Sequence, residues 1–295
     1  MTASRTLTAI DFSPASLAAL EFAVVLASKE HEPIVHAVHA ISLPRTPVLS
    51  GEAVLAADFD ARLRAEHEEA LRKAVERHAH GPVAVHPHVV EGAPASAIVA
   101  EAKARDCTRI AVGATGRGVL PRFLLGSTAE RVVRTSGLDV LVVPAPGEHA
   151  PARTRIRNVV CALDFAPPSG LALQRASAIS RAHDARLHVV HAWHVAPYVA
   201  RMPELLESIE RDMGRELDAT AHRHETPGRT LLLHLRRGVP DVEILRAATE
   251  VEADLVVVGT TGKTGVDHFL LGSVAERVTR ASHVPVLVAR VPVSE

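Results

Sequence analysis

An internal duplication is the feature that most constrains the fold of this chain. Residues 113–132 return as residues 259–278 with the same glycine spacing, at a constant offset of 259 − 113 = 146. Further landmarks recur in the same order, 9–12 as 162–165, 38–40 as 190–192, 92–94 as 238–240 and 140–143 as 286–289. A chain of 295 residues is long enough for two domains that each bury a core. We therefore predict domains at 1–145 and 155–295, joined by a turn-rich linker at 146–154.

Composition excludes several classes of protein. With 47% hydrophobic and 23% charged residues, the chain has an ordinary globular composition. Its 33 basic and 34 acidic residues give a net charge of −1, which argues against nucleic acid or an anionic membrane as the partner. The N-terminal residues lack a signal-peptide pattern, and the most apolar stretch, residues 17–27, is too short to span a bilayer. Two cysteines, Cys107 and Cys161, fit buried thiols in a reducing compartment, so we expect a cytoplasmic protein.

Short β-branched runs alternate with longer helical patterns in both copies. The expected strands of the first copy are 5–11, 33–40, 83–90, 109–113 and 139–143, and its expected helices are 14–30, 55–79, 94–105 and 127–136. The expected strands of the second copy are 156–163, 186–193, 229–236, 254–259 and 285–290. This alternation predicts an α/β fold with a mostly parallel sheet covered by helices on both faces. Ligands of such sheets bind outside the carboxyl ends of the strands.

A glycine loop lies between the fourth strand and the last helix of each copy. In the first copy the spacing is Gly-x2-Gly-x9-Gly-Ser, formed by Gly113, Gly116, Gly126 and Ser127. Gly113 and Gly116 can take a positive φ and leave bare backbone open to a ligand, while Gly126 removes a side chain where the loop returns. Ser127 begins a helix whose first N–H groups attract an anion, and Arg117 adds a cation nearby. The loop therefore predicts a site for the phosphates of a nucleotide.

The second copy repeats this loop as Gly259, Gly262, Gly272 and Ser273, with Lys263 in place of the arginine. Two other nucleotide motifs do not fit. A Walker A loop needs a glycine five residues before Gly262, where the chain has valine. A dinucleotide fingerprint needs its glycines after the first strand, whereas here they follow the fourth.

A purely structural interpretation of the loop also exists. The pairs Ser127/Glu130 and Ser273/Glu276 have the spacing of a capping box, in which the serine accepts from the helix backbone and the glutamate reaches back. Capping explains the serine and the glutamate but not three glycines kept at fixed spacing in both copies. We therefore favour the nucleotide interpretation.

Two acidic residues follow the first strand of each copy. Asp11 and Asp164 are either ligand contacts or N-terminal caps of the helices that begin near Pro14 and Pro167. The histidine pairs at 78/80 and 86/88 suggest a metal site, but no Cys, Asp or Glu stands at ligand spacing beside them. We interpret these histidines as exposed residues at a helix end and on a strand, and predict no metal site.

Together these motifs closely resemble the universal stress protein family, in its tandem two-domain form and its ATP-binding branch. The resemblance implies two Rossmann-like domains of the adenine nucleotide alpha hydrolase-like type, each with a five-stranded parallel sheet of order 3-2-1-4-5. It also implies ATP as the ligand, with or without Mg²⁺. The implied nucleotide-binding residues are Asp11, Ala40, Gly113, Gly116, Arg117, Gly126, Ser127 and Thr128 in the first copy and Asp164, Ala192, Gly259, Gly262, Lys263, Gly272, Ser273 and Val274 in the second.

Within that resemblance the aspartates lie by the ribose and adenine, Ala40 and Ala192 present backbone to the adenine, and the glycines and serines hold the ribose and phosphates. The family also pairs domains through their last strands, here 140–143 and 286–289. Such pairing would make the chain an internal pseudo-dimer, and a homodimer of tandem chains stays open.

The leading hypothesis for function is a stress-response module in which ATP occupancy sets the conformation or the choice of partner. A slow ATPase or phosphotransferase is one alternative, although the sequence offers no general base or metal carboxylate pair. A nucleotide-free interaction scaffold is the other. We expect at most weak ATP hydrolysis.

Overall fold

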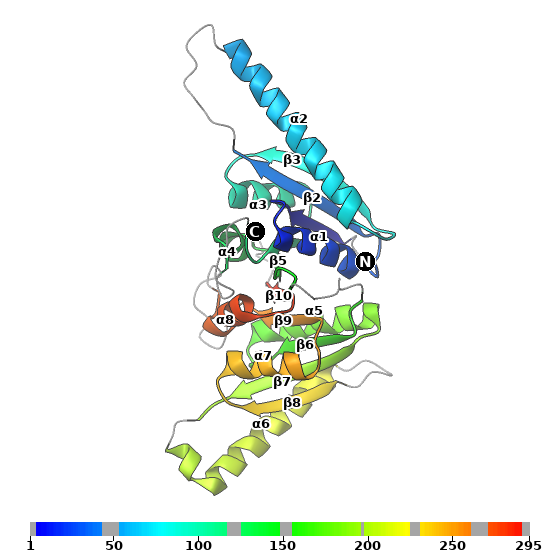
Figure 1. Ribbon diagram of the computed structural model, residues 1–295. Helices are drawn as coiled ribbons and strands as arrows, with labels where there is room; N and C mark the ends of the chain where they lie inside the picture. The colour runs from blue at the N-terminus through cyan, green and yellow to red at the C-terminus, as the bar shows by residue number, and fades with distance from the viewer. Residues whose placement is uncertain are drawn as a thin grey trace. The chain divides into compact units, whose positions relative to one another are not determined.

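The computed structural model describes residues 4–42, 53–116, 125–147, 155–195, 198–224, 231–260 and 271–290, except for the side chains of 53–58, 167, 168, 200 and 224. The chain divides into two compact units, Met1–Thr154 and Arg155–Glu295 (Figure 1). Most of the predicted linker, 148–154, lies outside the described residues.

The first unit contains five strands and four helices among its described residues. The strands are β1 (Arg5–Ala9), β2 (Ile34–Ile41), β3 (Ala84–Glu91), β4 (Arg109–Gly113) and β5 (Asp139–Val143). The helices are α1 (Pro14–Ala27), α2 (Ala53–His78), α3 (Pro94–Ala104) and α4 (Ser127–Thr135). All neighbouring strands pair in parallel, in the order β3-β2-β1-β4-β5. Helices α1 and α2 pack together, as do α3 and α4, so each face of the sheet is covered.

The second unit repeats this architecture. Its strands are β6 (Asn158–Ala162), β7 (Arg186–Trp193), β8 (Leu232–Arg237), β9 (Leu255–Gly259) and β10 (Val286–Ala289). Its helices are α5 (Pro167–His183), the 3₁₀ turn η1 (Val199–Arg201), α6 (Pro203–His224), α7 (Pro240–Glu250) and α8 (Ser273–Ala281). The parallel order is β8-β7-β6-β9-β10. The predicted fold class, two tandem domains of order 3-2-1-4-5, is confirmed.

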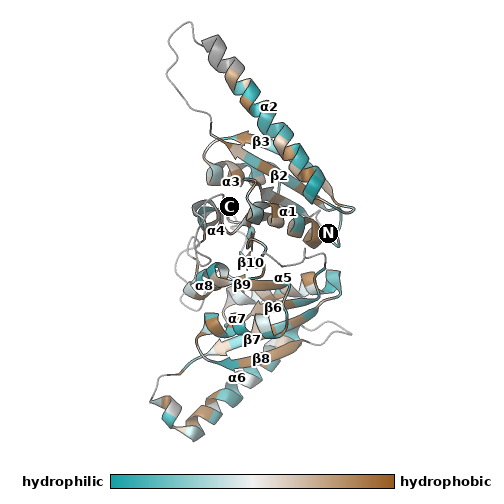
Figure 2. Ribbon diagram, viewed as in Figure 1, coloured by the Kyte–Doolittle hydropathy of each residue, from teal (hydrophilic) through white to brown (hydrophobic). Residues whose placement is uncertain are grey.

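The sequence pattern explains which strands are most deeply buried. The strands β4, β5 and β9 are short runs of aliphatic residues that are buried almost throughout, as expected for strands with helices on both faces. The edge strands β3 and β8 are half-buried or exposed along their length and carry polar residues, histidine in both and arginine in β8. Hydrophilic residues dominate most of α2, which extends beyond the edge of its sheet (Figures 1 and 2).

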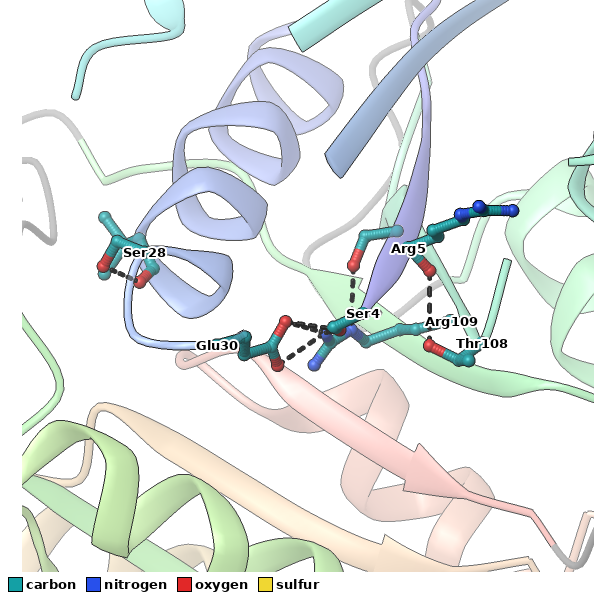
Figure 3. Close-up of polar contacts among 8 residues, drawn as sticks. Ser4, Arg5, Ser28, Glu30, Thr108 and Arg109 are labelled. Atoms are coloured by element: carbon teal, nitrogen blue, oxygen red, sulfur yellow. Dashed lines mark hydrogen bonds and ion pairs between the residues drawn. The ribbon is translucent and has the colours of Figure 1, made fainter. Parts of the chain in front are cut away.

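One partly buried ion pair of the first unit has no equivalent in the second. The Arg109 guanidinium, at the start of β4, donates to both carboxylate oxygens of Glu30 at 2.8 and 3.0 Å (Figure 3). The Ser4 hydroxyl donates to the same carboxylate at 2.5 Å. Glu30, in the connection after α1, is thereby tied to the amino ends of β1 and β4. The repeat places Leu255 where Arg109 stands, so this pair is not a feature of the duplicated site.

Candidate functional site

Each unit has a cavity at the carboxyl ends of its two central strands, where the strand order reverses. The cavity of the first unit has a volume of about 320 Å³ and that of the second about 210 Å³. The switch point of a doubly wound sheet is the usual ligand position in this architecture. The predicted residues that line the cavities are Asp11, Ala40, Gly113, Gly116, Gly126, Ser127 and Thr128 in the first and Asp164, Ala192, Gly259, Gly272, Ser273 and Val274 in the second. Three predicted residues, Arg117, Gly262 and Lys263, lie outside the described residues.

The first wall of each cavity is the turn that follows β1 or β6. In the first unit, Oδ1 of Asp11 accepts hydrogen bonds from the backbone N–H of Ser13 at 2.9 Å and from its hydroxyl at 2.5 Å. Ser13 is the N-cap of α1, because its hydroxyl accepts from the backbone N–H of Ser16 at 3.2 Å. The suggestion that Asp11 caps this helix is therefore wrong. Its carboxylate instead stabilises the turn two residues before the cap.

In the second unit, Oδ1 of Asp164 accepts from the backbone N–H of Ala166 at 3.1 Å, and Ala166 is the N-cap of α5. Asp164 is therefore not the cap either. Both carboxylates are half-buried, line their cavities and are oriented by a backbone N–H two residues later.

A phenylalanine in a strained conformation follows each aspartate. Phe12 and Phe165 have φ of 64° and 61°, in the left-handed region that side chains larger than glycine seldom adopt. Each ring packs on a buried histidine, Phe12 on His39 with centroids 4.7 Å apart and Phe165 on His191 at 4.3 Å. The ring contacts help to hold the turn that presents the aspartate.

The sequence did not lead us to predict these two histidines as site residues, although both lie in the repeated segments. Nδ1 of His39 donates to the carbonyl of Ile10 at 2.6 Å, and Nδ1 of His191 donates to Leu163 at 2.7 Å. The carbonyls belong to the residues just before the aspartates. Each histidine therefore fixes the backbone at the end of β1 or β6 from the neighbouring strand. The presence of histidine at the same position of both copies was the signal that could have revealed this role.

The glycines of the first loop are explained by close packing. A Cβ at Gly113 would lie 2.7 Å from the backbone carbonyl carbon of Ala15 and from the backbone nitrogen of Ser16. A Cβ at Gly116 would lie 3.0 Å from Oδ2 of Asp11. Neither glycine has a φ in the left-handed region, so the expected use of positive φ at these positions is wrong. Gly113 is required because β4 passes against the first turn of α1.

The second wall of each cavity is the first turn of α4 or α8. The N-caps are Gly126 and Gly272, which carry no side chain to cap the helix, so Ser127 and Ser273 are the first helical residues. The capping-box interpretation of the two serines is therefore wrong. Glu130 forms an ion pair with Arg134 at 3.2 Å, one turn along the helix. A helix N-terminus without a capping side chain favours an anion in the adjoining cavity.

Histidines and cysteines elsewhere do not form a metal site within the described residues, where no group of three or more His, Cys, Asp or Glu side chains could hold an ion.

The exposed character expected of the histidine pairs is only partly right. Nδ1 of His78 donates to Oε1 of Glu21 at 2.7 Å, and His88 is half-buried against His36. Both cysteines are buried, and burial raises the pKa of Cys107 to about 11, which keeps it a neutral thiol.

Architecture and site together define a tandem Rossmann-like α/β protein with one glycine-lined cavity per repeat. The model of the universal stress protein family matches residues 3–144 and 155–290. This chain belongs to the universal stress protein family. No helix in the described ranges is long and apolar enough to cross a membrane.

Individual relatives support this assignment. A universal stress protein of Methanocaldococcus jannaschii is 36% identical over 145 residues, covering 47% of this chain and 85% of that protein. One from Mycobacterium tuberculosis is 31% identical over 203 residues and covers 63% of this chain, but the match spans only 62% of that protein. The solved structure of a universal stress protein from Archaeoglobus fulgidus covers 97% of this chain and 98% of its own, with a TM-score of 0.65 and 22% identity, and shows the shared fold.

Proposed function

We propose that this universal stress protein binds ATP, or a closely related adenine nucleotide, in both cavities, and that occupancy sets its conformation or its choice of partner protein. The observation that carries the proposal is that, in each unit, a half-buried aspartate and a helix N-terminus capped by glycine line the same cavity. A carboxylate accepts hydrogen bonds from ribose hydroxyls, and the helix N-terminus attracts phosphate.

The cavity sizes suit partial enclosure of such a ligand. Ligand sites commonly have volumes of about 300–1,000 Å³, and the first cavity, at about 320 Å³, falls within this range. The second, at about 210 Å³, is smaller. Leu163, Ile244 and Val258 give the second cavity an apolar wall that suits a base, and Ile10, Ile98 and Val112 do the same in the first.

The test blocks the cavities through their helix caps. A Cβ at Gly126 would lie 3.4 Å from the carbonyl oxygen of Ala114 and 3.7 Å from the backbone nitrogen of Gly116, so the methyls of a valine would fill the phosphate space. The φ of −63° at Gly126 and −60° at Gly272 is open to any residue, so the fold should survive. We expect Gly126→Val with Gly272→Val to abolish ATP binding in isothermal titration calorimetry, and each single variant to halve the stoichiometry.

Gly214 provides the matched control, because a Cβ there meets nothing within 4 Å and the residue lies on α6, away from the residues lining both cavities. Gly214→Val should bind ATP like the parent chain. Unchanged affinity in the double variant would refute the site. Absence of nucleotide binding by the parent chain would favour the scaffold alternative instead.

A further inference from the structure

At two positions of the sites the first unit has a hydroxyl and the second does not. Ser13 of the first unit stands where the second has Ala166, each being the N-cap of its helix. Thr128 of the first unit stands where the second has Val274, each being the second residue of its helix and lining its cavity. The remaining predicted residues described in both units are of the same type. One exchange outside that set runs the other way, because buried Thr260 lines the second cavity where the first unit has Ala114.

The Ser13 hydroxyl adds a second hydrogen bond, beside that of its backbone N–H, to the Asp11 carboxylate of the first site. Its hydroxyl lies 2.5 Å from Oδ1 of Asp11 and 3.3 Å from the carbonyl of Thr115 in the glycine loop. Ala166 can offer Asp164 only its backbone N–H, at 3.1 Å. A carboxylate fixed by an additional charge-assisted hydrogen bond loses less rotational freedom when a ligand binds.

Thr128 adds a donor at the anion-favouring end of α4. Threonine and valine have nearly the same shape, so this exchange changes the hydrogen bonding of the cavity and little of its size. Within the described part of the chain, the Thr128 hydroxyl forms no hydrogen bond to another residue. It is therefore available to donate to a phosphate oxygen, which Val274 cannot do.

We propose, on the basis of the function proposed above, that the two sites are unequal. The first unit binds ATP more tightly than the second, and Ser13 and Thr128 set the difference. Thr128 acts on the phosphates directly, and Ser13 is a positioning residue for Asp11. The larger volume of the first cavity agrees with this order.

The experiment measures each site in the full chain with the other site blocked. Calorimetry with ATP on the Gly272→Val chain reports the first site, and the Gly126→Val chain reports the second. We expect the first site to bind ATP at least about tenfold more tightly than the second, because one hydrogen bond to a charged group contributes about that much affinity. In the first site, Thr128→Val and Ser13→Ala should each weaken ATP binding about tenfold.

The reciprocal changes in the second site are decisive, because a gain of affinity cannot result from misfolding. Val274→Thr and Ala166→Ser should each tighten ATP binding there about tenfold. Adenosine separates the two roles, since Thr128→Val should leave the Kd for adenosine unchanged while Ser13→Ala should raise it. Thermal unfolding should show that Ser13→Ala lowers Tm through the lost cap. Ser13→Gly, a well-tolerated N-cap that cannot donate to Asp11, should largely avoid this loss without restoring affinity.

Equal affinities of the two sites for ATP would overturn this inference alone and leave the proposed function standing. Second-site variants that bind ATP no more tightly than the Gly126→Val chain would also overturn it. If neither background chain nor the parent chain binds ATP, the proposed function fails and the inference fails with it.

Discussion

Acid is expected to destabilise both units through equivalent histidine pairs that join β2 to β3 and β7 to β8. Nδ1 of His36 lies 3.2 Å from Nε2 of His88, and Nδ1 of His188 lies 3.0 Å from Nε2 of His234. In the first unit, Arg105 donates to Nδ1 of His88 at 3.1 Å. A guanidinium only donates, so Nδ1 of His88 is the acceptor and its Nε2 carries the proton that is donated to His36.

Both inner histidines are held neutral. Burial, followed by the charge of Arg105 and the neighbouring His88, His86 and Arg5, lowers the pKa of His36 to about 4. Burial, followed by His234 and Arg186, lowers the pKa of His188 to about 4.

The sign of the pH effect follows from these directions. An unfolded histidine has a pKa of about 6.5, so between about pH 6.5 and 4 the unfolded chain binds protons that the folded chain does not. Stability is therefore complete above about pH 6.5 and falls as the pH drops toward 4. A pKa difference of about 2.5 corresponds to at most about 3 kcal/mol per histidine, and solvent screening at the sheet edge reduces this to about 1–2 kcal/mol.

The assay is urea unfolding followed by circular dichroism at pH 7.0 and 4.5. The parent chain should lose about 2–4 kcal/mol more than a chain carrying His36→Gln and His188→Gln, whose amides do not titrate. His80→Gln, at an exposed residue beyond α2, is the matched control and should behave like the parent. Equal losses for the parent and the double variant would refute the reasoning.

Two further predictions concern turnover and assembly. ATP incubated with the pure protein should persist at close to its background rate, and turnover on the order of 1 per second or faster, measured by phosphate release, would favour the enzyme alternative. Residues 1–147 expressed alone should dimerise, because β5 would be an open apolar edge of high β propensity. Light scattering should find that dimer dissolved by Val140→Lys with Val142→Lys, provided circular dichroism shows the fold retained, and a monomeric parent fragment would contradict terminal-strand pairing.

The repeat and the alternation of patterns were sufficient to predict the fold. Matching landmarks in the same order marked equivalent elements in the two copies, and continuous apolar runs marked strands buried on both faces. The strand bounds were therefore predicted to within about three residues. Parallel strands bring their carboxyl ends to one edge, so residues at those ends, such as Asp11 and Gly113, could be assigned to one site without coordinates.

Only the tertiary structure decided what the individual residues of the site do. Gly113 is a glycine because the backbone of Ala15 and Ser16, about 100 residues away in sequence, leaves no room for a Cβ. His39 holds the carbonyl of Ile10 from a neighbouring strand. Hydrophobic periodicity indicates which face of an element is buried, because this pattern can be read along a single segment. The 2.6 Å hydrogen bond of His39 and the lack of room for a Cβ at Gly113 depend on how two distant segments are placed against each other. No pattern within either segment records that placement.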